Sequence, residues 1–382
     1  MKSIRRTKAI VNVDSLYHNV LEFKKTCKPK TLIAGVLKAN AYGHDLLQMA
    51  TYFKDLKVDY FAVATLEEAL FLRNHFESIP ILVMGYTPDD DLEFSVVNSI
   101  TTTIFSIEQA KILNSFAKKH NIISKIHIKI DTGFHRLGYT DLNKAFFEIL
   151  QINLFSNINI EGIFSHLALE NKESDKIQYE KFISLINMLS LKQIDIPIKH
   201  ICDSIGAVVY PEYHLDMVRV GALFYGYCSR ETSFELKPVM SLQTEISSVK
   251  ELNKGEGVSY DNLFRAPCNM KIATLPIGYA DGLPRNIYKK GFALVNNIKS
   301  PYIGLPCMDQ CMIDISDSNA KQGDTAILFG ETLPLNELSK WCETNKNELL
   351  SRISMRVPRV FVKNNKIVKI VDYLNKGDSY EI

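Results

Sequence analysis

Residues 32–37 read LIAGVL and are followed at once by Lys38. A short apolar run with polar neighbours is typical of a buried strand. Seven further runs of this kind follow, separated by segments in which apolar residues recur every three or four positions. They span residues 60–64, 79–84, 101–105, 125–130, 160–164, 198–202 and 217–225. Eight strands that alternate with helices predict a (β/α)8 barrel, with an open doubly wound sheet as the alternative.

A second kind of pattern begins after Tyr227. From Pro238 onward short apolar runs alternate with glycine-containing turns, and a short helix is predicted at residues 335–343. The runs span 242–249, 270–276, 292–295, 303–304, 312–315, 325–329 and 359–363. Since 382 residues are also too many for one ordinary core, we predict two domains. These are a barrel at residues 1–235 and a strand-rich domain at residues 236–382.

Composition argues against several kinds of partner and site. The 45 basic and 43 acidic residues give a net charge of +2, which provides no electrostatic basis for binding nucleic acid or an anionic membrane. The seven cysteines lack the paired spacing of a zinc site, so we expect no metal, reduced thiols and a cytoplasmic location. No stretch has the roughly 18 apolar residues of a membrane span. Residues 11–14 interrupt any export signal at the basic N-terminus.

Lys38 is the most informative single residue of the chain. A buried ammonium group is costly, so a lysine at the end of a buried strand usually has a chemical role. An amine in a partly dry pocket has a lowered pKa and becomes a nucleophile for carbonyl cofactors such as pyridoxal 5'-phosphate. The simpler interpretation is a lysine just past the strand end whose side chain extends to water.

Polar side chains gather just after the predicted strands, where barrel enzymes build their active sites. Lys38 and Tyr42 follow the first strand, and residues 131–136 follow the fifth. The others are residues 165–166 after the sixth strand, 203–204 after the seventh, and Arg219 within the eighth. We therefore expect one site at the carboxyl ends of the barrel strands.

Each of these residues also has a plainer interpretation. His166 alone is more typical of a structural histidine, and Arg136 alone suggests an ion pair with Asp131. The turn at residues 204–206 and the small residues 221–222 lie where the last two loops of such barrels often hold a phosphate group. Their joint position at one rim favours a site for a phosphorylated cofactor.

Further motifs extend this pattern through nearly the whole chain. Lys38 is followed by ANAYGH at residues 39–44. The other blocks are KIDTG at 129–133, RLG at 136–138, SH at 165–166, RVG at 219–221, KPVMSL at 237–242, GVSY at 257–260, IGYADG at 277–282, CMDQ at 307–310 and RVPR at 356–359. In these motifs and their order the chain resembles the alanine racemases. The resemblance implies a barrel followed by a β-domain, and a head-to-tail homodimer in which each β-domain completes the partner's active site.

The resemblance also implies a reaction with two bases, one on each face of the substrate. Racemisation removes the α-proton from one face and returns a proton on the other. Lys38 then exchanges the proton of the D-isomer, and Tyr260, contributed across the dimer interface, exchanges that of the L-isomer. A phenol is a weak base at neutral pH, so we expect His166 and Arg219 to activate Tyr260.

Roles for cofactor binding follow from the same resemblance. Arg219 matches the residue that faces the pyridine nitrogen of pyridoxal 5'-phosphate. Because a guanidinium keeps its proton, we expect the ring to stay unprotonated, which favours simple reprotonation over transamination. The residues implied at the phosphate are Tyr42 and Ser204, with the backbone of Gly206, Gly221 and Ala222.

The remaining implied residues concern the substrate. Arg136 and the backbone near Met308 are expected at the substrate carboxylate, and Tyr279 near the entrance. Lys129 matches a lysine that is often carbamylated in the family and supports Arg136. A plain pair between Lys129 and Asp131 is the alternative.

Several positions depart from the usual family pattern. Met355 replaces a common tyrosine, Phe134-His135 replaces Met-Asn, and Leu305-Pro306 replaces an Arg-Val pair. Because a hydrophobic pocket separates small side chains by only about 1–3 kcal/mol, serine or another small amino acid remains an alternative substrate. A decarboxylase and a non-catalytic pyridoxal-phosphate carrier are further alternatives, although the GVSY block at 257–260 argues against the first. The presence of residues 236–382 argues against the second. In a bacterium the product D-alanine would supply cell-wall precursors.

Overall fold

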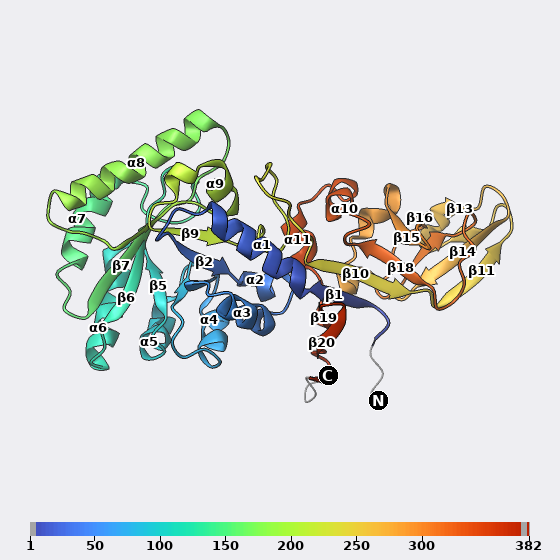
Figure 1. Cartoon of the computed structure of the whole chain (residues 1–382), viewed down its shortest axis with the longest axis horizontal. Helices are drawn as coiled ribbons and strands as arrows, with labels where there is room; N and C mark the ends of the chain where they lie inside the picture. Colours follow the sequence, from blue (N-terminus) through green and yellow to red (C-terminus); the bar gives the residue numbers. More distant parts are fainter. Residues whose placement is uncertain (1–4, 376–379, 382) are drawn as a thin grey trace.

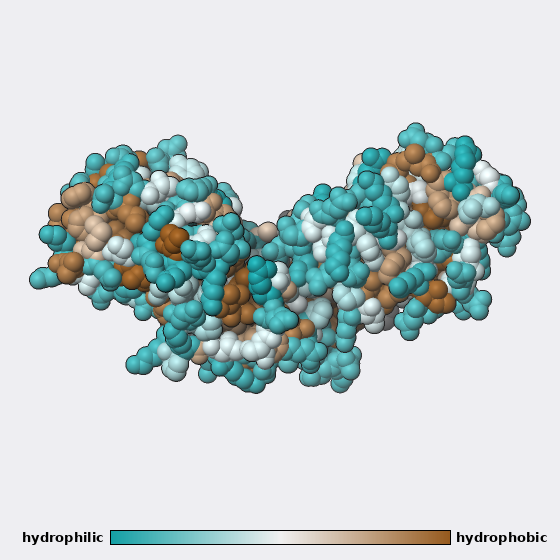
Figure 2. All heavy atoms as spheres, turned by 90° about the horizontal axis from the view of Figure 1, so that it is seen from above, coloured by the Kyte–Doolittle hydropathy of each residue, from teal (hydrophilic) through white to brown (hydrophobic). Residues whose placement is uncertain are grey.

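A computed structural model of the chain describes residues 5–375 and 380–381. The molecule is elongated, with a barrel and a strand-rich part lying end to end (Figure 1). Seen from above, a broad notch separates the two parts, and the surface on both sides is mostly hydrophilic (Figure 2). One continuous cluster of buried apolar side chains runs from the barrel into the second part. Within the described residues, no helix combines the length and apolar character needed to cross a membrane.

Eight parallel strands form the barrel in the order β8-β7-β6-β5-β4-β3-β2-β9. Their bounds are β2 Leu32–Val36, β3 Tyr60–Val63, β4 Ile81–Val83, β5 Thr101–Ile104, β6 Ser124–Lys129, β7 Ile158–Phe164, β8 Ile198–His200 and β9 Met217–Val220. β2 pairs with both β3 and β9, so the first and last barrel strands are neighbours. Between β8 and β9, the backbone N–H of Asp216 donates to Lys199 O (3.0 Å) and that of Arg219 to Cys202 O (3.1 Å). The predicted barrel is confirmed, and the open sheet is excluded.

Helices surround the barrel strands in the sequence order that a (β/α)8 fold requires. They are α1 Val13–Thr26, α3 Leu46–Asp55, α4 Leu66–Arg73, α5 Leu92–Val97, α6 Ile107–Lys119, α7 Leu142–Ile152, α8 Lys172–Ser190 and α9 Ser204–Val209, with the short segments α2 Lys38–Tyr42, η1 Asp89–Asp91 and η2 Pro211–Tyr213. Most begin at a polar side chain that accepts a backbone N–H, as Thr65 does in a capping box with Glu68. Such caps explain why these helices start at the carboxyl end of one strand and return the chain to the next.

The second part is built on an eleven-stranded sheet in the order β11-β14-β17-β16-β15-β18-β10-β1-β19-β20-β21. Its strands are β1 Lys8–Asn12, β10 Met240–Glu245, β11 Ser248–Leu252, β14 Met270–Leu275, β15 Phe292–Val295, β16 Ile298–Ile303, β17 Cys311–Asp314, β18 Thr325–Phe329, β19 Arg359–Lys363, β20 Lys366–Val371 and β21 Tyr380–Glu381. A small hairpin joins β12 Gly257–Val258 to β13 Phe264–Arg265. The helical segments are α10 Leu335–Trp341, α11 Lys346–Ser351, η3 Tyr260–Asn262, η4 Tyr279–Asp281 and η5 Arg285–Lys289.

The first strand differs from the predicted division of the chain. We expected residues 1–235 to form the barrel domain, yet β1 lies in the sheet of the second part. It pairs antiparallel with β10 and parallel with β19, and the side chains of Ala9 and Val11 are buried there. A strand that alternates buried and half-buried residues suits this sheet, whereas barrel strands are buried on both faces. The boundary between residues 235 and 236 itself stays a prediction.

Candidate active site

A cavity of about 460 Å³ opens at the carboxyl ends of the barrel strands. Nine predicted site residues line it: Lys38, Tyr42, Lys129, Arg136, His166, Ser204, Arg219, Gly221 and Ala222. Gly206 lies in α9, directly after the lining residue Ile205. The nine lining residues come from five separate strand ends, and all except Lys129, which was expected from the resemblance alone, were predicted from their position at or just after the strand ends. A volume of this size suits a small ligand or cofactor, for which pockets of roughly 300–1,000 Å³ are usual.

The lining of this cavity is strongly cationic. It contains the amines of Lys38 and Lys129 and the guanidinium groups of Arg136 and Arg219, against a single carboxylate, Asp203. Unbalanced cations in a partly dry cleft attract anions. The site is therefore suited to a ligand, or a pair of ligands, that carries phosphate or carboxylate groups.

The turn after β2 is left-handed, although its residues are not glycine. Ala39, Asn40, Ala41 and Tyr42 have φ values of 54°, 53°, 52° and 53°. Each such residue costs on the order of 1–2 kcal/mol, and strain of this kind persists only where surrounding contacts enforce it. The turn sets Lys38 and Tyr42 together on the cavity wall.

Lys38 has the environment of a reactive amine. Burial lowers its pKa, and the nearby cations of Arg136 and Arg219 lower it further. The neutral, nucleophilic form of the amine is therefore more populated than in an exposed lysine. This supports the chemical interpretation of Lys38 over the solvent-exposed one.

Arg219 is held by acceptors on three sides. Its Nη1 donates to Nδ1 of His200 (2.7 Å), and its Nη2 donates to the carbonyl of Ser165 (3.0 Å) and lies 3.2 Å from Nδ1 of His166. Burial and the charge of Arg219 lower the pKa of both histidines, to about 2 for His166. Neutral imidazoles accept these hydrogen bonds, so the guanidinium keeps its charge and a fixed orientation at the cavity wall.

A chain of hydrogen bonds continues from Arg219 into the barrel. Because Nδ1 of His200 accepts from Arg219, its Nε2 carries the proton and donates to Nδ1 of His127 (2.9 Å). Nε2 of His127 then lies 3.6 Å from a carboxylate oxygen of Glu161. Because a guanidinium can only donate, the bond from Arg219 fixes the tautomer of His200 and, through it, that of His127.

Lys129 and Asp131 do not form the predicted ion pair, and Asp131 does not pair with the guanidinium of Arg136. Asp131 instead accepts the backbone N–H groups of residues 133–136 at 2.9–3.0 Å and folds the loop that carries Arg136. Lys129 Nζ donates to the carbonyl of Ile130 (2.6 Å), and burial, with the charge of Arg219 next, lowers its pKa to about 7. The Arg136 guanidinium stacks on the ring of Phe134, 4.3 Å from its centre.

In the predicted phosphate region, two of the backbone N–H groups already donate to side chains of the same chain. The N–H of Gly221 donates to Ser204 Oγ (2.8 Å), and the N–H of Gly206 donates to Asp203 Oδ1 (2.9 Å). A Cβ at Gly221 would lie 2.5 Å from the hydroxyl of Tyr42. Only glycine therefore leaves room for this hydroxyl at the cavity wall.

Three predicted site residues lie outside the cavity, in the second part. Tyr260, Tyr279 and Met308 are 60%, 43% and 53% exposed. The segment 304–308 connects their loops: Ser259 Oγ donates to Leu305 O (2.6 Å), and the N–H groups of Tyr279 and Ala280 donate to residues 307 and 308 (3.1 and 3.0 Å). One chain thus presents these three residues on linked loops, away from its own Lys38.

Comparison with known proteins matches the barrel and the second part to two domains of one family. Residues 11–229 match the family model described as alanine racemase, N-terminal domain, and residues 239–361 match that of the alanine racemase C-terminal domain. The chain belongs to the alanine racemase family. This family depends on pyridoxal 5'-phosphate, and the first match covers the part that contains the whole cavity rim except Asn347.

Individual relatives support the same assignment over the full length. An alanine racemase of Clostridium tetani is 40% identical over 386 residues, covering 98% of this chain and all of the relative. A solved alanine racemase of Clostridium difficile 630 has a TM-score of 0.93 and 36% identity, covering 98% of this chain and 100% of that one. A solved histidine racemase of Leuconostoc mesenteroides is also similar, with a TM-score of 0.85, 26% identity and coverage of 94% and 98%.

The residues of the cavity fit the cofactor of the alanine racemase family. Lys38 supplies an amine of lowered pKa, and the excess of cations suits a phosphorylated ring compound. The space kept open by Gly221 lets the Tyr42 hydroxyl face the cavity beside Ser204. Lys38 would hold the aldehyde carbon, Arg219 the ring nitrogen, and Tyr42 with Ser204 the phosphate.

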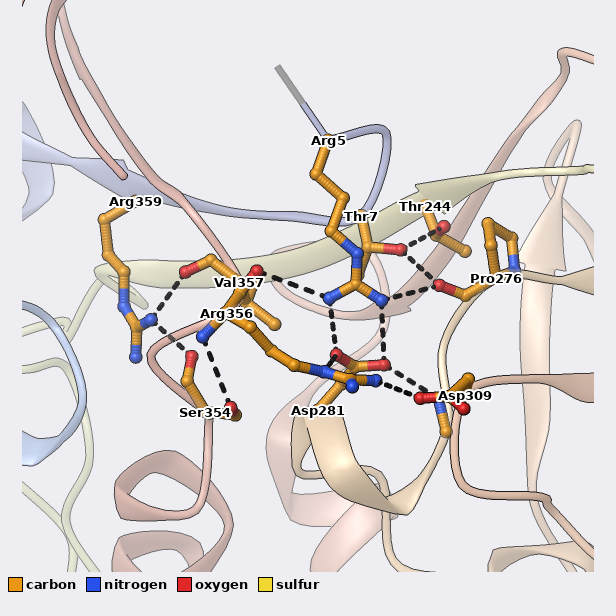
Figure 3. A network of polar contacts seen from close by, with 11 residues as sticks. Arg5, Thr7, Thr244, Pro276, Asp281, Asp309, Ser354, Arg356, Val357 and Arg359 are labelled. Carbon is orange, nitrogen blue, oxygen red and sulfur yellow. Dashed lines mark hydrogen bonds and ion pairs between the residues drawn. The ribbon is translucent and has the colours of Figure 1, made fainter. Parts of the chain in front are cut away.

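A buried carboxylate holds the racemase loops that carry Tyr279 and Met308 (Figure 3). Asp281 is fully buried and accepts from both Nη atoms of Arg5 and from Nε of Arg356 (2.8 Å). Nη2 of Arg356 also donates to Asp309 (2.6 Å), in the loop of Met308. Hydrogen bonds from the two guanidinium groups lower the pKa of Asp281, although burial alone would raise it. Arg5 thus connects the start of the described chain to the loops of the candidate site.

Sequence reasoning missed residues of two kinds. His200, at the end of β8, holds Arg219. The predicted strand ran on to residue 202, so the strand-end rule was applied only from Asp203 and did not include His200. Asn347 reaches the cavity from α11 in the second part. No sequence signal distinguishes this asparagine, since α11 is short and its contact with the barrel is made only in the folded chain.

Proposed function

We propose that this protein interconverts L- and D-alanine, with pyridoxal 5'-phosphate bound at Lys38. The observation that carries the proposal is the position of Lys38: an amine of lowered pKa in a cationic cavity, next to Arg219 and Tyr42. Family membership over nearly the whole chain supports the same reaction. In a bacterial host, the product would supply D-alanine for peptidoglycan, and a cytoplasmic location stays a prediction.

The bound cofactor supplies one thing, an electron-withdrawing ring that makes the α-hydrogen of the amino acid acidic. The residues of the chain do the rest. The neutral amine of Lys38 takes or returns the proton on one face of the α-carbon. Arg219, which keeps its own proton, would hold the ring nitrogen without protonating it. Arg136, whose guanidinium lies on Phe134 and makes no ion pair among the described residues, would bind the substrate carboxylate.

The second base must come from another copy of the chain. Within one chain Tyr260 is exposed and does not line the cavity that contains Lys38. We infer a homodimer in which Tyr260, Tyr279 and Met308 of each subunit complete the partner's cavity. The exposed apolar residues Leu263 and Met355, 57% and 56% exposed, support an interface on the same part of the molecule.

Lys129 is proposed as a carbamylated support for Arg136. Its pKa of about 7 leaves a large fraction of neutral amine, which is the form that reacts with carbon dioxide. The ion pair with Asp131, the alternative, has lost its main support, because Asp131 is occupied by backbone N–H groups.

Another substrate remains a second proposal. A relative with the same fold is a histidine racemase, and Phe134 here packs against His166 at 4.9 Å and carries Arg136. Phe134 is larger than the methionine expected at this position, so it alters the wall of the site beside the substrate carboxylate.

A racemisation assay with a panel of L-amino acids tests the proposal. We expect alanine to give the highest kcat/KM, and Lys38→Ala to abolish both racemisation and the visible absorption of the bound cofactor. If kcat/KM is higher for serine or histidine than for alanine, that amino acid and not alanine is the substrate. Unchanged absorption in Lys38→Ala would remove Lys38 from its role.

A further inference from the structure

The left-handed turn that presents Lys38 and Tyr42 is held by residues from the far end of the chain. The hydroxyl of Tyr373 accepts from Asn40 Nδ2 (2.9 Å) and donates to Asp45 Oδ2 (2.6 Å). Asn40 lies within the turn and Asp45 lies three residues after its last member, Tyr42, and Asp45 also has a positive φ of 93°. One phenol therefore ties the middle of the turn to its exit.

A second contact closes the turn from the same side. Arg359 is completely buried, and its Nε donates to the carbonyl of Gly43 (2.8 Å). Its other donors bind the carbonyls of Ile353, Ser354 and Val357 at 2.6–2.7 Å, and Figure 3 shows the last two beside it. A guanidinium held by four backbone carbonyls is a rigid support.

The turn also lies flat against α11. A Cβ at Gly43 would come within 2.2 Å of the carbonyl oxygen of Leu350, so the two backbones are in direct contact. The barrel also holds the turn: the N–H of Ala39 donates to Glu68 Oε1 (2.6 Å), Nδ1 of His44 lies 3.0 and 2.9 Å from the carbonyl oxygens of Ala41 and Tyr42, and the N–H of Leu46 donates to Asn40 Oδ1 (2.7 Å). The strained conformation is therefore enforced from both parts, and Tyr373 and Arg359 make the side-chain bonds that come from the second part.

We propose that Tyr373 and Arg359 are positioning residues that hold the left-handed turn 39–42, and through it Lys38 and Tyr42, in the conformation that binds the cofactor. The proposal rests on the proposed role of Lys38 and Tyr42 toward pyridoxal 5'-phosphate. Without these bonds only the barrel contacts hold the turn and it adopts ordinary backbone angles more often, because four consecutive non-glycine residues do not keep positive φ values unaided. Cofactor affinity then falls, since part of the binding energy must restore the turn.

Tyr373→Phe removes only the hydroxyl and is the main test. The cofactor-free full-length protein is titrated with pyridoxal 5'-phosphate, and binding is followed by visible absorption. We expect Kd to rise about tenfold, as loss of two hydrogen bonds implies, and amide hydrogen exchange at residues 38–46 to accelerate even without the cofactor. Tyr288→Phe is the matched control, a tyrosine of the second part whose hydroxyl makes no hydrogen bond with the described residues; it should leave both quantities unchanged.

A rescue variant separates this role from general stability. Ala39 is exposed, so Ala39→Gly loses little packing and removes the strain at one of the four residues of the turn. In the Tyr373→Phe background, Ala39→Gly should recover part of the lost affinity. If Tyr373→Phe does not fold, Arg359→Lys, which keeps the charge but loses the fork of donors, takes its place with the same expectations.

The outcomes are distinct from those that test the function. If wild-type protein binds no cofactor, the proposed function fails, and hydrogen exchange at residues 38–46 still tests the turn. If wild type binds the cofactor and Tyr373→Phe binds it equally well with unchanged exchange, the positioning role is wrong. A loss of affinity that Ala39→Gly does not recover would also overturn it.

Discussion

Nη1 of Arg219 lies 2.7 Å from Nδ1 of His200, and this bond makes a buried histidine the acceptor for the residue predicted to face the cofactor ring. Substituting His200 by Phe removes the acceptor and leaves a buried donor of Arg219 unpaired, at a cost of about 1–3 kcal/mol. We expect the free energy of unfolding to fall by that amount in urea titrations. We also expect kcat to fall for both isomers, because Arg219 loses its fixed orientation. Equal kcat values for His200→Phe and wild type would show that this bond has no catalytic consequence.

Tyr260→Phe should slow exchange of the α-hydrogen unequally for the two isomers, whereas racemisation itself falls equally in both directions because each direction uses both bases. Removal of a positioned general base typically costs about 10²–10⁴-fold, and only exchange of the L-isomer's proton depends on this phenol. Exchange of the α-hydrogen with deuterated water, followed by NMR for each isomer, measures the difference. Equal losses for L- and D-alanine would contradict the assignment of two bases on opposite faces.

Shared active sites predict complementation between two inactive variants. Lys38→Ala and Tyr260→Phe remove residues from opposite subunits of each proposed site, so a mixed dimer keeps one intact site. Random mixing after co-expression should recover about a quarter of wild-type activity. The control is a mixture of the two separately folded homodimers, kept under conditions in which they do not exchange subunits. This mixture should stay inactive. No recovery on co-expression would place Lys38 and Tyr260 in the same subunit's site.

Carbamylation of Lys129 should follow its titration. Its pKa of about 7 means that the neutral amine increases as the pH rises from about 6 to 8. At a fixed concentration of dissolved ¹³C-labelled carbon dioxide, a protein carbamate signal in the ¹³C NMR spectrum should grow over that range. Lys129→Ala should lack this signal. If the wild-type spectrum also lacks the signal, Lys129 is not carbamylated and remains an amine that donates to the carbonyl of Ile130.

The ion-pair cluster at Asp281 makes a prediction about acid stability. Its pKa is lowered in the folded protein, so its stabilising contribution is complete above the unfolded value of about 3.9 and is lost as the pH falls through the lower folded value. Asp281→Asn should lower the free energy of unfolding at pH 7 by about 3 kcal/mol, because two guanidinium groups lose a buried partner. The difference from wild type should shrink at acid pH. Asp309→Asn, with a carboxylate 59% exposed, should have a much smaller effect at any pH.

The barrel and its rim were predictable because both depend on local patterns. Alternating strands and helices indicated the fold, and Lys38, Arg136 and Arg219 were found from their positions near strand ends. The place of β1 was not predictable, because the sequence of five residues does not say that β10 and β19, more than two hundred residues away, are its neighbours. The partners of the Lys38 turn were also missed: Tyr373 is more than three hundred residues away in the sequence, and nothing in its neighbourhood marks its hydroxyl.

The position of β1 between β10 and β19 also constrains the order in which the chain folds during synthesis. Residues 8–12 leave the ribosome before the barrel strands, but their hydrogen-bonding partners at 240–245 and 359–363 emerge more than two hundred residues later. The barrel strands need no residue beyond 220 to pair with one another. The nascent protein therefore completes its barrel while β1 stays unpaired, and ribosome-bound intermediates should expose residues 8–12 to proteases until residues 240–245 and 359–363 have emerged.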